Sequence, residues 1–189
     1  MILSQPFIIL YIMNTCSIFT GLFAVNNFKT YGQKNGLTNE SYLGLLGSLT
    51  AVFNSIRFIW SYATDYYSYK LIYGILLTMQ IILDFTVPLV AENDILFGIW
   101  VCAMLFCEGG HFTLLPNVLR KIYGENSTGL YGLIFSYTGI CSILMIVLQG
   151  EFLGDTSKSY NAFFYFIGGL SCVSLLLLLT LFKEEKFQG

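Results

Sequence analysis

Long apolar runs separated by short polar stretches dominate this chain from end to end. Because an α-helix rises about 1.5 Å per residue, roughly 20 apolar residues cross the hydrocarbon core of a bilayer. The apolar runs therefore predict six membrane-spanning helices in a single all-α domain that covers residues 1–189. The predicted helices are 5–26, 41–63, 71–90, 95–119, 129–149 and 160–182.

The polar stretches between the runs predict the loops and the helix ends. The longest loop is expected at 29–39, which is rich in Gly, Asn and Lys, and another is expected at 150–159. Asn, Asp, Ser and Thr side chains accept hydrogen bonds from the free backbone N–H groups at the start of a helix. We therefore expect the stretches Glu92-Asn93-Asp94 and Asn126-Ser127-Thr128, which precede the fourth and fifth apolar runs, each to supply an N-cap.

The composition is that of an integral membrane protein. Only 11% of the residues are charged, whereas soluble domains carry about a quarter charged residues. The net charge of −2 offers no basic surface for phosphates, which excludes a nucleic-acid partner. The five cysteines all lie in apolar runs, at spacings unlike those of a zinc site or a disulfide framework.

The sequence carries no signal of catalysis. It has no glycine-rich phosphate loop, no nucleophile elbow of the G-x-S-x-G type and no His/Cys cluster for a metal. Its single histidine cannot supply both axial ligands of a bis-histidine haem. We therefore expect a protein that is not an enzyme and that uses neither a cofactor nor a metal.

The distribution of Lys and Arg predicts the orientation in the membrane. With an even number of spans both termini share one side, and six basic residues fall on that side against three on the other. The larger group comprises Arg57, Lys70, Arg120, Lys121, Lys183 and Lys186. Both termini are therefore expected in the cytosol, or in the matrix if the host is the mitochondrial inner membrane.

The stretch 107–116 is the most unusual part of an apolar run, because it holds Glu108 and the only histidine, His111. Ionisable groups at membrane depth are costly and usually have a partner. Three residues apart on a helix, Glu108 and His111 are expected to share a face. Gly109 and Gly110 between them allow another backbone to approach closely.

Two other features of ionisable groups leave alternatives open. His111 is either a proton relay, since a histidine titrates near neutrality, or a core histidine that hydrogen-bonds to a neighbour. Asp84 lies four residues before Pro88 and is expected near the outer end of its helix. There we expect the carboxylate to reach headgroup water or to bond to the backbone.

Four groups of residues follow one another in the order seen in a known transporter family. They are Asn14-Thr15 to Gly21-Leu22; Leu46-Gly47-Ser48 with Phe53-Asn54, Arg57, Trp60 and Asp65; Cys107 to Phe112 with Pro116; and Tyr131-Gly132 with Ser136. In this order they resemble the last six helices of a major facilitator superfamily transporter. The closer resemblance is to the oxalate/formate antiporter and monocarboxylate transporter branch. It implies half of a major-facilitator-type bundle, without the first six helices.

The resemblance implies a substrate site around Arg57. In that branch the arginine of the eighth helix binds the substrate carboxylate, and a guanidinium can grip a carboxylate with two parallel hydrogen bonds. The other residues expected at the site are Asn54, Asn14, Glu108 and His111. Oxalate-type members carry a second basic residue in the eleventh helix, whereas 129–149 contains no Lys or Arg.

Arg57 and Glu108 fit two different roles. In the functional interpretation they are a substrate-binding and proton-coupling pair. In the structural interpretation they form a buried ion pair that locks two helices together, and loss of either partner leaves an uncompensated charge. The lack of a second base for a dicarboxylate favours the structural ion pair.

Two functions follow for the chain. In the first, it is a transporter-derived structural or accessory subunit of a larger membrane complex, for which a respiratory assembly of the mitochondrial inner membrane is one host, and it transports nothing itself. In the second, it is a carrier of mono- or dicarboxylates that works as a dimer of halves. The missing half and the missing base favour the first. The expected partners are membrane lipids together with other membrane-protein subunits or a second copy of the chain.

Overall fold

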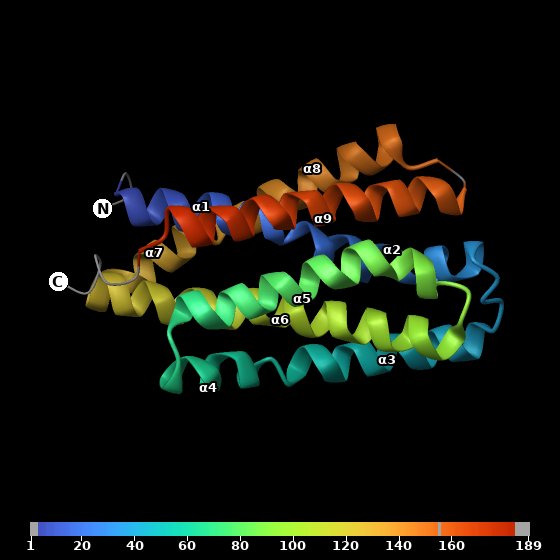
Figure 1. Cartoon of the computed structure of the whole chain (residues 1–189), viewed down its shortest axis with the longest axis horizontal. Helices are drawn as coiled ribbons and strands as arrows, with labels where there is room; N and C mark the ends of the chain where they lie inside the picture. Colours follow the sequence, from blue (N-terminus) through green and yellow to red (C-terminus); the bar gives the residue numbers. More distant parts are fainter. Residues whose placement is uncertain (1–3, 155, 184–189) are drawn as a thin grey trace.

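The computed structural model describes residues 4–154 and 156–183, and that part of the chain is helical with short turns and no strand (Figure 1). The all-α prediction is therefore confirmed. The helices are α1 (Gln5–Ser17), α2 (Phe19–Lys34), α3 (Glu40–Ser55), α4 (Phe58–Tyr66), α5 (Tyr69–Val90), α6 (Asp94–Tyr123), the 3-10 helix η1 (Gly124–Asn126), α7 (Ser127–Ile134), α8 (Ser136–Phe152) and α9 (Ser157–Thr180).

Five helical segments of the described chain are long and apolar enough to cross a membrane. The fourth of them, Asp94–Phe152, has 59 residues, far more than the roughly 20 that one crossing needs. It contains a reversal at Gly124, whose φ of 57° is the left-handed backbone that glycine tolerates. Figure 1 shows α6 and the α7–α8 rod running in opposite directions on either side of this reversal. Divided there, the segment makes two crossings, and the polytopic fold agrees with the six predicted spans.

The first crossing is longer than predicted, because α2 continues to Lys34 through half of the loop expected at 29–39. Tyr31 explains the extension: its side chain is buried and its hydroxyl donates to Asn161 of α9 at 2.6 Å. The helix ends only before Gly36, whose φ is 96°. The polar composition of this stretch therefore concealed one buried helical face.

The two predicted N-caps have different outcomes. The prediction for 92–94 is confirmed, because the Asn93 side chain accepts a hydrogen bond from the Leu96 backbone N–H at 3.0 Å. The prediction for 126–128 is wrong, since the backbone of Asn126, the residue before α7, is already helical and its side chain makes no capping bond. Here α7 follows directly from η1, and the chain enters the helix without the extended residue that a side-chain cap requires.

Three crossings are interrupted within the membrane. The interruptions lie at Ile18 between α1 and α2, at Ile56–Arg57 between α3 and α4, and at Phe135 between α7 and α8. None of them is at a proline, since Pro88 and Pro116 lie inside α5 and α6. Each interruption changes the local backbone hydrogen bonding and gives nearby side chains a place to bond to carbonyl groups.

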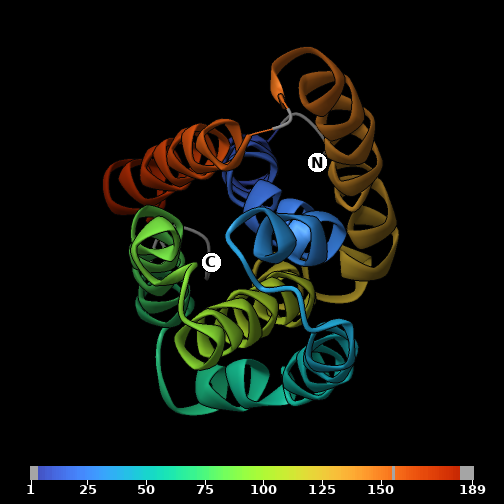
Figure 2. The same cartoon turned by 90° about the vertical axis from the view of Figure 1, so that its right-hand side faces the viewer.

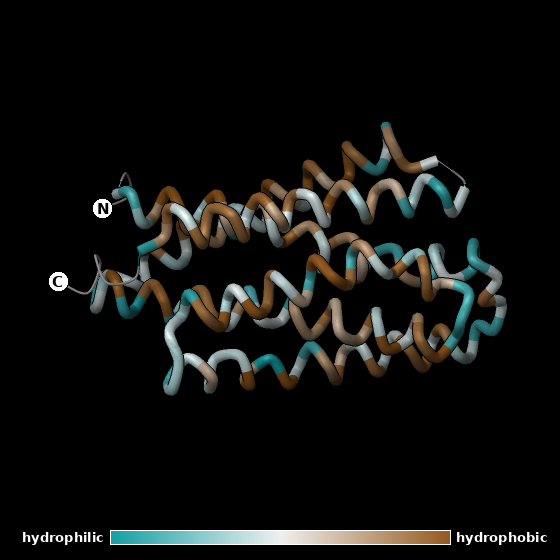
Figure 3. The backbone as a smooth tube through the Cα atoms, in the orientation of Figure 1, coloured by the Kyte–Doolittle hydropathy of each residue, from teal (hydrophilic) through white to brown (hydrophobic). Residues whose placement is uncertain are grey.

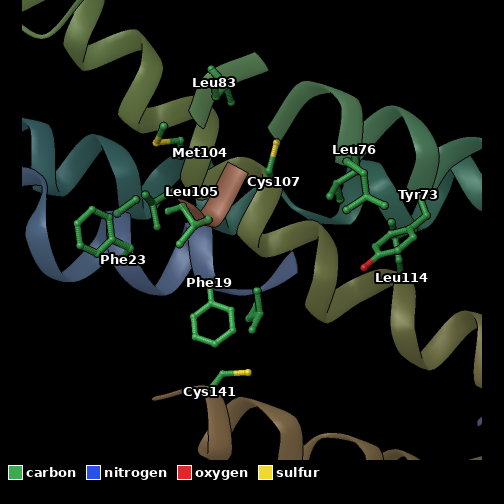
Figure 4. Packing of buried hydrophobic residues seen from close by; sticks show 14 of the residues in the cluster. Phe19, Phe23, Tyr73, Leu76, Leu83, Met104, Leu105, Cys107, Leu114 and Cys141 are labelled. Atoms are coloured by element: carbon green, nitrogen blue, oxygen red, sulfur yellow. The ribbon is translucent and has the colours of Figure 1, made fainter. Parts of the chain in front are cut away.

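Helix α6 is at the centre of the bundle. It packs against α2, α3, α4, α5 and α7, while α5 and α9 form the most extensive helix pair on one side. Figure 2, which views the bundle from one end, shows α6 between α5, the α3–α4 rod and α2. Around it, apolar side chains from several helices form one core, including Phe19 and Phe23 of α2, Leu76 of α5 and Leu105 of α6 (Figure 4).

Burial differs strongly between the crossings. In the first, Gln5–Lys34, 61% of the most apolar window is buried inside the bundle, against 22% in the second, Glu40–Tyr66. The exposed side chains of the second crossing are large and apolar, as in Leu45, Val52 and Phe58. Figure 3 shows hydrophilic residues between hydrophobic ones midway along this rod. The second crossing therefore carries an apolar outer surface with polar groups midway along it.

Candidate functional site

Successive residues of an α-helix are rotated by about 100°, so the central polar stretch of α6 faces several helices at once. Glu108 contacts α2 and α3, and Gly109 contacts the junction between α3 and α4. Gly110 contacts α4 and α5, and His111 contacts α5. The two ionisable side chains therefore lie on adjoining sides of α6 and meet different neighbours, instead of sharing one site.

Glu108 is held between α2 and α3 by a single hydrogen bond. Its side chain is 7% exposed, and Asn54 Nδ2 donates to its Oε2 at 3.3 Å. Its stem lies directly against Gly21 of α2, where any added Cβ atom would overlap the Glu108 side chain. Gly21 thus creates the space that a carboxylate on α6 occupies.

Gly109 and Gly110 bring α4 close to α6, as the sequence predicts. A Cβ atom on Gly109 would lie 2.6 Å from Arg57 Cβ and 3.1 Å from the Asn54 carbonyl oxygen. One on Gly110 would lie 3.0 Å from Trp60 Cδ1 and would overlap Leu76. Contacts this short leave no room for a side chain, so the backbone of α6 itself packs against the α3–α4 junction.

Arg57 lies in the interruption between α3 and α4, well inside the membrane. It precedes the end of α4 at Tyr66 by nine residues, or roughly 14 Å. Its carbonyl oxygen accepts a hydrogen bond from Thr113 of α6 at 3.3 Å, and its side chain is exposed. Because Arg57 lies at this depth, it no longer counts among the basic residues of the loops. The predicted orientation then rests on five basic residues on the side of the termini against three on the other side.

Arg57 and Glu108 approach each other without forming the ion pair that the sequence predicts. Among the described residues no salt bridge joins them, because Glu108 is buried whereas the Arg57 side chain is exposed. The guanidinium lies close enough to act electrostatically on Glu108 and on Tyr131 of α7. The hydrogen bond from Asn54 takes the place of the ion pair, so Arg57, Asn54 and Glu108 form one polar group.

His111 lies in a second polar group that joins α1, α5, α6 and α9. His111 Nε2 is 2.9 Å from Gln80 Oε1, and His111 Nδ1 is 3.3 Å from the Tyr73 hydroxyl oxygen. Gln80 Nε2 donates to the Ser17 carbonyl oxygen and to Ser171 Oγ, both at 2.7 Å. Ser17 Oγ and the Tyr73 hydroxyl are 2.9 Å apart. With His111 only 1% exposed, this network lies wholly inside the bundle.

Asn14 belongs to the His111 network and does not join Arg57. Its Nδ2 donates to the Leu10 carbonyl oxygen at 2.8 Å, and its Oδ1 lies 3.5 Å from the Tyr73 hydroxyl. The five predicted site residues therefore divide into two sets. Arg57, Asn54 and Glu108 meet at the α3–α4 junction, whereas Asn14 and His111 meet in the core.

Asp84 is fully buried, which corrects the expectation that it reaches headgroup water. Thr20 Oγ1 of α2 donates to its Oδ2 at 2.6 Å, while Oδ1 has no hydrogen-bond partner among the described residues. Gly168 of α9 packs directly over it, since a Cβ atom there would lie 3.1 Å from Asp84 Cβ. The packing of α2 and α9 over this part of α5 is the reason for the burial.

The comparison with known proteins supports the fold that surrounds these two polar groups. The sequence profile of the Major Facilitator Superfamily matches residues 4–189. The chain belongs to the Major Facilitator Superfamily. The resemblance of the four motif groups to this superfamily is thereby confirmed.

Three proteins whose names describe carriers or transporters are similar to parts of the chain. Apicoplast pyruvate carrier 1 of Toxoplasma gondii is 25% identical over 102 residues, 52% of this chain and 19% of that protein. Monocarboxylate transporter 14 of Mus musculus is 32% identical over 80 residues, 42% of this chain and 15% of that protein. The Homo sapiens Monocarboxylate transporter 14 is 27% identical over 124 residues, 58% of this chain and 24% of that protein. The matches span only 15% to 24% of the length of these carriers.

Sequence reasoning on this superfamily member missed Gln80 and Thr20, which complete the polar contacts of His111 and Asp84. A signal existed for Gln80, because it is an amide inside the apolar run 71–90 and precedes Asp84 by four residues, on the same helical face. Thr20 carries no such signal. A hydroxyl in a membrane helix often bonds to its own backbone, and only the packing of α2 against α5 reveals its partner.

Other features of the described residues do not add to either polar group. No three His, Cys, Asp or Glu side chains lie together as a metal site within residues 4–154 and 156–183. All five cysteines are free. A groove of about 1570 Å³ runs along α5 from Lys70 to Leu83, beside Trp100 of α6 and Leu175 of α9, and none of the predicted site residues lines it.

Proposed function

We propose that this chain forms a six-helix unit of a carrier that binds a small monocarboxylate at Arg57. The exposed Arg57 side chain at the interruption between α3 and α4 is the observation that carries the proposal. Asn54 and Glu108 lie beside it and supply the polar surroundings that orient a carboxylic acid. Relatives named as pyruvate and monocarboxylate carriers support this class of substrate.

The depth of Arg57 in the membrane supports a role in binding. An arginine at the centre of a membrane helix costs about 2.5–3.5 kcal/mol on insertion scales, so lipid is an unfavourable surrounding for it. The exposed guanidinium therefore faces a water-filled path or the polar surface of another polypeptide. A water-filled path gives a small anion access to Arg57, which then binds the carboxylate with two parallel hydrogen bonds.

The local charges favour a substrate with one carboxylate. The segment 129–149, which contains most of α7 and α8, has no Lys or Arg that could bind a second one. Glu108 lies on the other side of Asn54, where a second substrate carboxylate would meet a like charge. Together these charges support a monocarboxylate over a dicarboxylate.

We further propose that a second membrane-embedded unit covers the exposed side of the α3–α4 rod. Only 22% of the most apolar part of this crossing is buried, and the exposed Arg57 side chain belongs to the same rod. Another six-helix unit or a second copy packed there encloses Arg57 in a cavity and shields it from lipid. Placement of both termini in the cytosol or the matrix, and a mitochondrial inner membrane as host, remain predictions from the sequence.

Uptake of labelled pyruvate into proteoliposomes tests the proposal, using the protein purified in mild detergent with whatever proteins accompany it. We expect Arg57→Ala to abolish uptake and Arg57→Lys to retain a small part of it, since lysine keeps the charge but cannot bind bidentately. Arg120→Ala is the matched control, because it removes the other arginine, exposed near the end of α6. Wild-type uptake by Arg57→Ala, or no monocarboxylate uptake by the wild type, overturns the proposal.

The apolar outer face also supports a second candidate, a transporter-derived accessory subunit that transports nothing itself. In that case the exposed face packs against other subunits, and Arg57 pairs with an acidic group on one of them. Comigration with a large membrane complex at fixed stoichiometry supports this candidate. Arg57→Ala then lowers the amount of assembled complex and leaves no uptake to lose.

A further inference from the structure

The hydrogen-bond donors around His111 determine where a neutral imidazole carries its hydrogen. Gln80 Nε2 uses both of its hydrogens, on the Ser17 carbonyl and on Ser171 Oγ at 2.7 Å each. The atom of Gln80 that faces His111 is therefore Oε1, which can only accept. His111 Nε2, 2.9 Å away, must consequently be the protonated nitrogen of the ring.

The other ring nitrogen, Nδ1, meets a chain of hydroxyl groups that can run in two directions. When Nδ1 carries no hydrogen, Ser17 Oγ donates to the Tyr73 hydroxyl and Tyr73 donates to Nδ1. When a proton forms an N–H bond at Nδ1, this group donates to the Tyr73 oxygen and Tyr73 donates to Ser17 Oγ. Ser17 then donates to the Met13 carbonyl oxygen at 2.9 Å.

The two hydroxyls, Ser17 Oγ and that of Tyr73, each keep a donor or acceptor partner in both states. The Met13 carbonyl keeps a hydrogen bond from Ser174 Oγ at 2.9 Å when Ser17 turns away from it. Because the single Tyr73 hydrogen goes to His111 Nδ1 or to Ser17 Oγ, the long 3.5 Å hydrogen bond to Asn14 Oδ1 is given up in both states, so the reversal itself orphans no further polar group. A histidine with a purely structural role needs only the first of the two arrangements.

Charge balance is the remaining requirement, because desolvation opposes any buried cation. Asp84 follows Gln80 by one turn of α5, roughly 6 Å along the axis, and is fully buried. Its unpartnered Oδ1 is an exception to the rule that buried polar atoms are hydrogen-bonded, and such exceptions call for an explanation. An imidazolium at His111 and a carboxylate at Asp84 leave the centre neutral overall.

The titratable groups near the His111 network come from all the elements packed around it. They are Tyr73 and Asp84 on α5, Cys107 and Glu108 on α6, Cys16 on α1 and Tyr137 on α8. Helix α9 contributes the hydroxyls of Ser171 and Ser174, and α2 contributes that of Thr20. Because Glu108 faces α2 and α3, Asp84 is the carboxyl group that can balance a charge on His111.

We propose that His111 binds a proton from bulk water at Nδ1, that the Tyr73 and Ser17 hydroxyls reverse to accept it, and that Asp84 supplies the balancing charge. This proton site is separate from the polar group of Arg57, Asn54 and Glu108. It goes beyond the proposed carrier function and does not depend on it, because the test reads the imidazole directly and needs no transport.

The single histidine makes the test specific, since ¹⁵N-histidine labelling reports on His111 alone once a tag without histidine is used. NMR spectra of the labelled full chain in lipid nanodiscs distinguish the two neutral tautomers and the imidazolium. We expect the neutral form protonated at Nε2 to convert to the imidazolium as the pH is lowered from about 8 toward about 4, below the ordinary range of histidine because burial opposes the cation.

Variants of the supporting groups sharpen the test. Tyr73→Phe removes the acceptor of the Nδ1 hydrogen and is expected to move the midpoint of the conversion to lower pH by about one unit, a tenfold weaker proton affinity. Asp84→Asn is expected to move it in the same direction. Tyr137→Phe is the matched control, because it deletes another buried tyrosine hydroxyl, on α8, and should leave the midpoint unchanged.

If Tyr73→Phe does not fold, Ser17→Ala tests the same chain of hydroxyls and is expected to give a smaller shift to lower pH. A His111 that stays neutral wherever the protein is folded makes it a structural core histidine and overturns the proposal. A neutral tautomer protonated at Nδ1 also overturns it. So do equal midpoints in the wild type, in Asp84→Asn and in the folded hydroxyl variant.

Discussion

Glu108 and His111 lie three residues apart on α6, yet their surroundings are opposite in kind. Glu108 accepts one hydrogen bond of 3.3 Å and lies within the field of an exposed arginine, at the junction of α3 and α4. His111 has a polar partner at each ring nitrogen and is almost fully enclosed. The comparison teaches that one central helix can carry two polar groups of different kinds. Glu108 belongs to a group with few hydrogen bonds near the α3–α4 junction, and His111 belongs to a well-connected network in the core.

The difference arises from what packs against each side of α6. On the Glu108 side, small residues at Gly21 and Gly109 bring helices close while leaving few donors. On the His111 side, α5 presents an amide and a phenol at positions 80 and 73, seven residues or two turns apart. Among the described residues Glu108 is therefore held by one side-chain hydrogen bond, whereas His111 is constrained by several helices.

The largest expected effect comes from adding a side chain at the place where α6 packs closely against the α3–α4 junction. Gly109→Ala places a methyl group against Arg57 Cβ and the Asn54 carbonyl, so we expect a loss of up to about 3 kcal/mol in unfolding free energy. Thermal unfolding in detergent measures it. Gly44→Ala is the control, because Gly44 is a helical glycine with nothing within 4 Å and should change stability little. Equal melting temperatures for the two variants would contradict the close packing.

Loss of the imidazole should rank next. His111→Leu leaves the Gln80 carbonyl oxygen and the Tyr73 hydroxyl short of partners in the core, and we expect a cost of about 2 kcal/mol. The same unfolding assay measures it. If His111→Leu were as stable as the wild type, the network would not hold α5 to α6, and the contrast with Glu108 would disappear.

The hydrogen bond to Asp84 should contribute less. Thr20→Val keeps the shape of the side chain and removes the donor to Asp84 Oδ2, for which we expect a loss of about 1 kcal/mol. Thr78→Val is the matched control, since Thr78 is exposed and bonds only to Gly74 of its own helix. Indistinguishable unfolding of the two variants would show that α2 and α5 do not depend on this bond.

The smallest effect on stability is expected on the loosely held side. In Glu108→Gln the side chain can still accept from Asn54, so the unfolding free energy should change by less than about 0.5 kcal/mol. The lost charge no longer competes for Arg57, and we expect the apparent affinity for a monocarboxylate to rise about two- to fivefold. Uptake measured over a range of substrate concentrations tests this. A large loss of stability would place Glu108 in the same structural class as His111.

Much of the fold and part of the site could be predicted from residues alone. Uninterrupted apolar runs implied membrane helices, and the Gly109–Gly110 pair implied a close helix contact, which α4 provides. The extension of α2 to Lys34 could not be predicted, because the run of Asn, Lys and Gly hides a face that carries Tyr31. The burial of Asp84 was equally hidden, since it depends on α2 and α9, both distant in sequence.

The sequence by itself determined that this is an all-α membrane protein of the Major Facilitator Superfamily, because hydrophobic length and motif order are local properties of the chain. It also singled out Arg57, Glu108 and His111, because charge inside an apolar run is visible without a structure. Only the tertiary structure decided which of them belong together. Partners across helices depend on rotation and packing distance, and these place Asn54 beside Glu108 and Gln80 beside His111.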